Sequence, residues 1–391
     1  MNKEITPSQR VADIKEYYFS IKLREVAAMK AAGIDVVSLG VGGPDQAPSP
    51  ETIEALISGV SDPQSHGYQS HNGIPELRRA FADWYKRWYG VSLDLKSEVL
   101  PLIGSKEGVL HISLAFVNPG DTVLVPDPGY PAYTSVNKML GARIVKYPLK
   151  QENGWQPDFD ALERMDLTGV KLMWLNYPHM PTGAPAQMET FRRAVEFGRR
   201  HGILIVNDNP YSFILNDNPL SIMQTEGAKD VAIEMNSLSK SHNMPGWRVG
   251  VAVSNPRFIS YILKVKSNID SGQFKPMMLA AAKALEAGPE WYAEVNTLYG
   301  ERRKVAEKIM DALDCDFDPT QAGLFLWGKI RNPELTAEQL ADRLLHDAHI
   351  FLTPGFIFGE NGDGYIRISL CAPIGRLEEA LRRINALSAK S

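Results

Sequence analysis

Short runs of apolar and β-branched residues alternate along this chain with stretches in which apolar residues recur at helical spacing. Buried strands are predicted at residues 99–103, 122–126, 170–175, 203–208 and 248–254. Between the strands, the residues Leu77, Phe81, Trp84 and Trp88 recur at the spacing of one helix face. Because alternating strands and helices are joined by crossover connections, the pattern indicates a mostly parallel sheet covered by helices.

The pattern changes near residue 290. A long, charged amphipathic helix is predicted over residues 292–313, followed by short strands near 323–330 and 364–370 and by a helix at 375–388. No internal repeat or Gly/Ser linker separates this part from the rest. We therefore predict a three-layer α/β/α large domain over residues 46–285, and a smaller α+β domain built from residues 286–391 and the N-terminal segment 1–45.

Composition and charge narrow the classes of function. Of the 391 residues, 44% are hydrophobic and 23% are charged, which is typical of globular proteins. The net charge of −4 lacks the basic excess that nucleic acid requires, and no apolar run approaches the ~18 residues that span a bilayer. The start of the chain does not resemble a signal peptide, so we expect a cytoplasmic protein with neither a membrane nor a nucleic-acid partner. Cys315 and Cys371 have no zinc-binding spacing, and no metal site is expected.

The segment at 236–250 holds the strongest chemical signal. Lys240 lies among Ser237, Ser239 and Ser241 and is followed by Arg248. An amine held near an aldehyde can form a Schiff base, while neighbouring hydroxyls and a guanidinium bind an anion such as phosphate. Taken alone, such a lysine is more often a solvated residue in a turn, so both interpretations stay open at this point.

Two other segments also carry polar residues that we expect at the ligand-binding edge of the sheet. Asp208 ends the strand predicted at 203–208, at the edge where α/β sheets collect ligands, although such an Asp is more often a turn or helix-cap residue. Ser105 and Lys106 lie between a strand and a helix, where free backbone N–H groups can hold phosphate. Together with Lys240, they favour an anion-binding crevice.

In chain order, seven motifs resemble those of the class I/II aminotransferases, in the fold-type I family of pyridoxal phosphate (PLP) enzymes. These motifs are LGVGGPD, GSKEG, PDPGYPAY, NYPHMPTG, DNPY, SLSK…GWRVG and YIRISL. The resemblance extends from about Arg24 to Arg383, and is greatest to the branch that holds LL-diaminopimelate and alanine-type aminotransferases. It implies the fold-type I architecture, pyridoxal 5′-phosphate as cofactor, and ping-pong transfer of an amino group from an α-amino acid to a 2-oxoacid.

The resemblance also implies a role for individual residues. Lys240 would form the Schiff base and move the proton at the substrate Cα, and Asp208 would keep the pyridine nitrogen protonated. Tyr211 would donate a hydrogen bond to the phenolic oxygen, and Tyr130 would stack on the ring. The phosphate would be bound by Ser105, Lys106, Ser237 and Arg248.

Three more residues take roles from the same resemblance. Arg367 would bind the substrate α-carboxylate through two parallel hydrogen bonds, although an isolated arginine on a strand is more often part of a surface ion pair. Gly42 matches a loop whose bare backbone approaches the substrate. Tyr68 is similar to a residue that reaches the phosphate of the neighbouring subunit, which implies a homodimer with shared active sites.

One motif departs from the family pattern. The family's Asn-Pro-Thr-Gly is here Met180 to Gly183, so the amide expected to donate to the phenolic oxygen of the cofactor is absent. Either Tyr211 alone serves that oxygen, or Asn176, His179 or a water supplies the donor. We hypothesise that the loss raises the pKa of the Lys240 Schiff base.

Two other functions stay open on the sequence alone. A PLP-dependent carbon–sulfur β-lyase shares this fold and many of these motifs. A regulatory amino-acid sensor is disfavoured, since only 39 residues precede Gly40 and a DNA-binding domain has no room there.

The choice of substrate is also left open. Arg24 and Lys275 are candidates for binding a second carboxylate, although each is more often a solvated charge. The aromatic run from Tyr17 through Tyr18 to Phe19 could instead line an apolar pocket.

Overall fold

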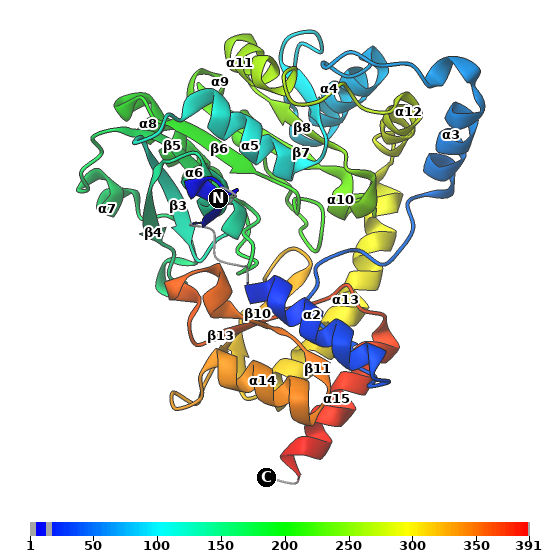
Figure 1. Ribbon diagram of the computed structural model, residues 1–391, viewed down its shortest axis with the longest axis vertical. Coiled ribbons are helices and arrows are strands. Elements are labelled where there is room, and N and C mark those ends of the chain that lie inside the picture. Colours follow the sequence, from blue (N-terminus) through cyan, green and yellow to red (C-terminus); the bar gives the residue numbers. More distant parts are fainter. Residues whose placement is uncertain (1–4, 13–17, 390–391) are drawn as a thin grey trace.

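The computed structural model describes residues 5–12 and 18–389, which form a large α/β domain and a smaller domain below it in the view of Figure 1. The large domain is built on a seven-stranded sheet of order β2-β8-β7-β6-β5-β3-β4. Its strands are β2 (Val99–Leu102), β3 (Thr122–Asp127), β4 (Arg143–Pro148), β5 (Val170–Leu175), β6 (Leu204–Asp208), β7 (Ala232–Ser237) and β8 (Gly250–Val253). Of these seven strands, only β8 runs in the opposite direction to the other six, so the predicted, mostly parallel sheet is confirmed.

All five predicted strands are present, and the sheet has two strands that the hydrophobic pattern did not indicate. β4 lies at the edge of the sheet and is largely exposed, so it lacks a continuous apolar run. β7 is fully buried but contains Glu234 and Asn236. The carboxylate of Glu234 accepts hydrogen bonds from Tyr85, Ser221 and Asn207 at 2.6 to 3.0 Å, and such partners allow a charged residue inside a sheet.

Helices cover both faces of the large sheet. Apolar side chains of one face pack with α5 (Ser105–Phe116), α6 (Pro131–Met139) and α11 (Pro256–Lys266). The other face packs with α4 (Pro75–Tyr89) and α8 (Met188–His201). Within β3, Leu124 belongs to one apolar cluster whereas Val123 and Val125 belong to the other, as the alternation of a strand buried on both faces requires. The three-layer α/β/α prediction is thereby confirmed.

The smaller domain holds an antiparallel sheet of order β12-β13-β10-β9. Its strands are β9 (Cys315–Phe317), β10 (Phe325–Ile330), β12 (Thr353–Pro354) and β13 (Tyr365–Ser369), and β1 (Val37–Ser38) pairs in parallel with β11 (Ile350–Phe351). Its helices are α2 (Tyr18–Ala31), α14 (Ala337–Asp347) and α15 (Ile374–Ser388). The pairing of β1 with β11 joins the N-terminal segment to the C-terminal part of the chain.

The remaining α-helices of the described residues are α13 and six others. The six are α1 (Gln9–Ala12), α3 (Pro50–Ser61), α7 (Phe159–Glu163), α9 (Ala228–Val231), α10 (Leu238–Ser241) and α12 (Lys275–Ala284). The helix predicted at 292–313 is α13 (Pro289–Ala312), which extends from the large domain to the smaller one (Figure 1). One apolar cluster continues through both domains, so the limits at 45 and 285 stay a prediction. No helix among the described residues is long and apolar enough to cross a membrane.

Candidate active site

A cavity of about 390 Å³ lies where the C-terminal ends of β6 and β7 meet the smaller domain. It is lined by all the predicted site residues except Tyr68, namely Gly42, Ser105, Lys106, Tyr130, Asn176, Asp208, Tyr211, Ser237, Lys240, Arg248 and Arg367. Parallel strands end at one edge of a sheet, and this common edge explains why residues far apart in the chain meet there. The structure therefore gathers the predicted chemistry in one place.

The amine of Lys240 faces this cavity. Lys240 lies in α10, directly after β7, and its Nζ donates a hydrogen bond of 2.5 Å to the carbonyl of Gly42. Burial lowers the pKa of Lys240, and the nearby guanidinium groups of Arg367 and Arg248 lower it further. A larger neutral fraction of the amine makes it a better nucleophile.

Asp208 ends β6, and its two carboxylate oxygens have different surroundings. The hydroxyl of Tyr133 donates to Oδ2 across 2.9 Å, whereas Oδ1 is buried and has no hydrogen-bond partner among the described residues. Burial raises the pKa of Asp208 to about 7. A buried carboxylate oxygen of this kind at a cavity wall suits a cationic N–H donor of a ligand.

Tyr133 is a site residue that the sequence reasoning missed. It lines the cavity and stacks on Trp174 with ring centroids 4.7 Å apart. The signal that could have found it is its position three residues after Tyr130, since residues i and i+3 at the start of a helix share a face.

An anion-binding cup lies on another wall of the cavity. Ser105 and Lys106 begin the twelve-residue helix α5, where free N–H groups and the helix dipole favour an anion. Ser237 and Arg248 add a hydroxyl and a guanidinium. A Cβ placed on Gly104 would lie 2.2 Å from Nη2 of Arg248, so only glycine leaves this guanidinium its space. The donor set suits a phosphate.

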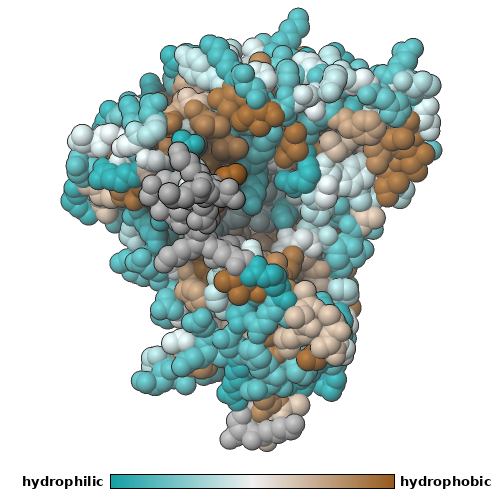
Figure 2. Space-filling model, in the orientation of Figure 1, coloured by the Kyte–Doolittle hydropathy of each residue, from teal (hydrophilic) through white to brown (hydrophobic). Residues whose placement is uncertain are grey.

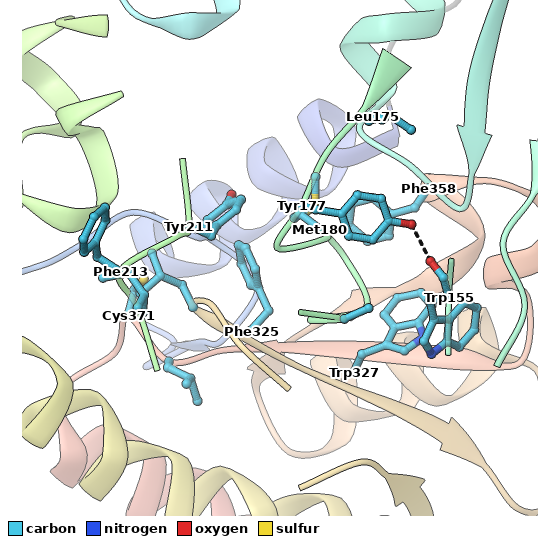
Figure 3. Close-up of a cluster of buried hydrophobic side chains, with 14 of the residues drawn as sticks. Trp155, Leu175, Tyr177, Met180, Tyr211, Phe213, Phe325, Trp327, Phe358 and Cys371 are labelled. Atoms are coloured by element: carbon cyan, nitrogen blue, oxygen red, sulfur yellow. Dashed lines mark hydrogen bonds between the residues drawn. The ribbon is translucent and has the colours of Figure 1, made fainter. Parts of the chain in front are cut away.

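The guanidinium of Arg367, on β13, makes two hydrogen bonds and two contacts with aromatic rings among the described residues. Its Nη2 donates to the carbonyl of Gly40 at 3.0 Å, and its Nη1 donates to Sδ of Met180 at 3.2 Å. Its guanidinium carbon lies 3.8 Å from the ring centroid of Phe325 and 4.6 Å from that of Phe358. Figure 3 shows these two rings and Met180 within one buried cluster. A guanidinium fixed between aromatic faces is well oriented to bind a carboxylate.

The comparison with known proteins agrees with this geometry. The family described as aminotransferase class I and II matches residues 34–384. The chain belongs to this family. It is 41% identical over 383 residues to an LL-diaminopimelate aminotransferase of Aquifex aeolicus (strain VF5), with 97% of this chain and 98% of the relative covered.

Solved structures lead to the same family. The aminotransferase is similar to apo-BacF of Bacillus subtilis, with a TM-score of 0.93, 36% identity and 98% of each chain covered. It is also similar to an aminotransferase of Staphylococcus aureus, with a TM-score of 0.87, 31% identity and coverage of 98% and 99%. The predicted class of enzyme is thereby confirmed. Members of this family use pyridoxal phosphate to move an amino group between an amino acid and a 2-oxoacid.

The residues of this aminotransferase fit that cofactor. The unpaired Oδ1 of Asp208 suits the protonated ring nitrogen, and the cup around Arg248 suits the phosphate. The amine of Lys240, whose pKa is lowered, suits the aldehyde. Each of the three groups of the cofactor therefore has a chemically matched partner in the same cavity.

The structure shows where the side chains lie that could replace the hydrogen-bond donor missing at Met180. The amide of Asn176 donates to the carbonyl of Asp208 at 2.6 Å and accepts from the backbone N–H of Met180 at 2.9 Å, so it holds this loop in place. Nδ1 of His179 lies 2.8 Å from the hydroxyl of Thr182, and His179 does not line the cavity. Burial lowers the pKa of His179 to about 3. Of the side chains proposed as donors, only Tyr211 and Asn176 reach the cavity.

Tyr211 lies in the same buried cluster. Its ring meets that of Phe325 edge to face, with centroids 6.0 Å apart (Figure 3). Burial raises the pKa of Tyr211, so its hydroxyl keeps its proton and can act as a donor near neutral pH.

Other predicted residues lie outside the cavity of their own chain. Tyr68 is 92% exposed, so it does not serve the cavity of its own subunit. Nζ of Lys275 lies 4.0 Å from a carboxylate oxygen of Asp62. Neither Lys275 nor Arg24 lines the cavity.

The residues of the aromatic run near the start of α2 lie in different places. Phe19 lines the cavity, whereas Tyr18 packs edge to face on Phe356 with centroids 5.1 Å apart. Tyr17 lies outside the described residues. The predicted apolar lining near the substrate is therefore supported for Phe19.

Proposed function

We propose that this aminotransferase binds pyridoxal 5′-phosphate through Lys240 and moves an amino group between an α-amino acid and a 2-oxoacid. One observation carries the proposal: Lys240, Asp208 and the anion cup with Arg248 line a single cavity, and Oδ1 of Asp208 is buried with no hydrogen-bond partner among the described residues. When bound, the cofactor supplies an electron sink for the carbanion that forms at the substrate Cα.

In this proposal, Lys240, Asp208 and Arg367 have separate roles in the reaction. Lys240, with its lowered pKa, takes and returns the proton at Cα. Asp208 holds the proton on the ring nitrogen, and Arg367 orients the substrate by gripping its α-carboxylate. Phe325 and Phe358 enclose this guanidinium and keep water from it, which strengthens its pairing with a carboxylate.

The experiment combines borohydride trapping with kinetics. After PLP loading and reduction, mass spectrometry is expected to find the label on the peptide that contains Lys240. Lys240→Ala is expected to lose the label and about a thousandfold or more in the rate of amino transfer. Lys106→Ala is the matched control, since Lys106 lines the same cavity; it should weaken PLP binding and keep the label at Lys240. A label on any other lysine contradicts the proposal.

The proposal also concerns which amino acid donates the amino group. Relatives about 40% identical over nearly the whole chain bear the name LL-diaminopimelate aminotransferase, which makes LL-diaminopimelate the first donor to assay. A single-turnover screen of amino acids, read as loss of the Schiff-base absorption band, compares it with other donors. Steady release of pyruvate and ammonia from cysteine without any 2-oxoacid would instead favour the carbon–sulfur lyase.

We also propose that two subunits form a homodimer with shared active sites. Exposed apolar residues lie on α3 and in the segment 269–274, and hydrophobic residues cover α3 in Figure 2. These residues are Ile57, Val60, Ile269 and Phe274. The ring of Phe274 lies 5.9 Å from that of His66, two residues before Tyr68, so the patch adjoins the exposed tyrosine. Apolar surface next to a candidate site residue is typical of an interface that completes the site.

Complementation tests the shared site. A mixture of Lys240→Ala and Tyr68→Ala subunits is expected to recover about a quarter of the wild-type activity, because half of the randomly formed dimers contain one intact site. Light scattering should give twice the mass of the chain. Failure of the mixture to exceed the sum of the separate variants would contradict a site shared between subunits.

A further inference from the structure

The segment from Gly40 to Asp45 contacts two basic groups of the active site, those of Arg367 and Lys240, through its backbone. The carbonyl of Gly40 accepts hydrogen bonds from Nη2 of Arg367 at 3.0 Å and from the hydroxyl of Thr353 at 3.1 Å. The carbonyl of Gly42 accepts from Nζ of Lys240 at 2.5 Å. The position of this segment therefore affects the proposed carboxylate-binding group and the proposed Schiff-base amine together.

One end of the segment is anchored by the backbone. The N–H of Leu39 donates to the carbonyl of Phe351 at 2.7 Å, and the carbonyl of Leu39 accepts from the N–H of Ser369 at 2.7 Å. In the part of the chain that the structure describes, no backbone–backbone hydrogen bond involves residues 41–45. The other end must therefore be held by side chains.

Arg302 provides that second anchor. Its Nη1 and Nη2 bind the two carboxylate oxygens of Asp45 at 2.7 and 2.8 Å, in the two-pronged geometry that is the strongest arrangement for this pair. Nη1 also donates to the carbonyl of Leu370 at 3.1 Å, just beyond the strand that carries Arg367. The side chain of Arg302 is 2% exposed and that of Asp45 is 24% exposed, so solvent screens the pair only in part.

The glycines make this anchor necessary. A Cβ on Gly40 would lie 2.5 Å from the ring of Phe351, and a Cβ on Gly42 would lie 2.2 Å from the ring of Phe325. The close packing requires glycine, and glycine gives the backbone extra conformational freedom. A segment with this freedom keeps its carbonyls in place only when both of its ends are fixed.

We propose that Arg302 and Asp45 form a positioning pair that holds residues 40–45 against the active site. The pair sets the carbonyl of Gly40 beside Arg367 and the carbonyl of Gly42 beside Lys240, although neither member of the pair lines the cavity. The inference rests on the proposed function, because it assigns the pair to the orientation of the carboxylate-binding and Schiff-base groups.

The test removes both charges at once. Loss of one partner would leave a buried charge unpaired and could unfold the protein, so the main variant is Asp45→Asn with Arg302→Gln. The matched control is Asp314→Asn with Arg331→Gln, which removes an exposed ion pair of 3.0 Å in the smaller domain. Two quantities are measured: KM and kcat of the PLP-loaded enzyme for both substrates, and hydrogen exchange of the cofactor-free protein.

The main variant is expected to raise KM for the amino acid and the 2-oxoacid about tenfold, since both carboxylates depend on Arg367. Hydrogen exchange should become faster in residues 39–46 and stay unchanged in β6. The control variant should match the wild type in both measurements. This combination would identify a local effect on the active site.

Two results overturn the inference. One is a main variant whose KM values stay within about twofold of the wild type. The other is exchange that rises evenly over the whole chain, as a merely structural pair would cause. Absence of amino transfer by the wild type would instead contradict the proposed function, so the two failures are distinguishable.

Discussion

The hydroxyl of Tyr133 donates to one oxygen of Asp208 across 2.9 Å, and the other oxygen is buried without a partner among the described residues. The two residues are 75 positions apart in the chain. Tyr133 orients the carboxylate through one oxygen, and a ligand can use the other. This division of one carboxylate between protein and ligand underlies the first two predictions.

Asp208→Asn is expected to remove a pH-dependent loss of stability from the cofactor-free protein. The folded-state pKa of Asp208 is raised from 3.8 to about 7 by burial, with the charge of Glu234 adding to the effect. A raised pKa stabilises the folded state fully below about pH 4, and this contribution is lost as the pH rises through about 7. The wild type should therefore lose stability relative to Asp208→Asn over this range, by roughly a few kcal/mol.

Urea unfolding at several pH values from 5 to 8 measures this difference. Asp35→Asn is the control, because Arg376 and Arg383 lower the pKa of the exposed Asp35 to about 2, below the range tested. If the free energy of unfolding changes equally with pH in the wild type and in Asp208→Asn, Asp208 does not titrate in this range.

Tyr133→Phe is expected to weaken PLP binding about five- to tenfold, since one hydrogen bond to a charged group is lost while the ring keeps its stacking on Trp174. Without this donor, the pKa of Asp208 should rise further, because the hydrogen bond from Tyr133 lowers it. Equilibrium dialysis against PLP gives the affinity. Tyr147→Phe is the control, since its hydroxyl binds the carbonyl of Trp174 and Tyr147 does not line the cavity. An unchanged affinity in Tyr133→Phe would exclude the orienting role.

Met180→Asn is expected to lower the pH at which the absorption band of the Lys240 Schiff base titrates. An asparagine amide can donate to the phenolic oxygen, and this weakens the hold of that oxygen on the imine proton. Met180→Leu is the control, since it keeps the volume and offers no donor; it should titrate as the wild type does. It also removes the sulfur that accepts from Arg367, so its KM reports on that contact alone. A spectrum of Met180→Asn that titrates at or above the wild-type pH contradicts the hypothesis.

Gly104→Ala is expected to weaken PLP binding tenfold or more, because the added Cβ would lie 2.2 Å from Nη2 of Arg248 and the backbone φ is +77°. Gly300→Ala is the control. Gly300 lies within α13, and apart from its chain neighbours and the backbone of its own helix no atom lies within 4 Å of an added Cβ, so this variant should gain about 0.5 to 1 kcal/mol of stability and keep its affinity for PLP. Titration of each variant with PLP gives the affinity, and thermal unfolding gives the stability. Normal binding by Gly104→Ala would mean that the guanidinium can move aside.

Some features of the site follow from local sequence. The apolar run before Asp208 predicts a strand, and a strand of a parallel sheet must end at the edge where ligands bind. The placement of Ser105 and Lys106 at a helix start follows equally from the strand and helix that flank them. The position of Lys240 directly after a strand was not predicted from the pattern, since β7 contains Glu234 and does not have an apolar pattern.

The sequence by itself determined the class of fold and the residue types of the active site, because helix and strand periodicities and the family motifs are local properties of the chain. Tertiary structure decided which side chains meet across the chain. Tyr133 lies beside Asp208, Met180 beside Arg367 and Asp45 beside Arg302 only because α6, β13 and α13 pack where they do. Contacts between residues up to 257 positions apart depend on the packing of whole elements, which no local pattern encodes.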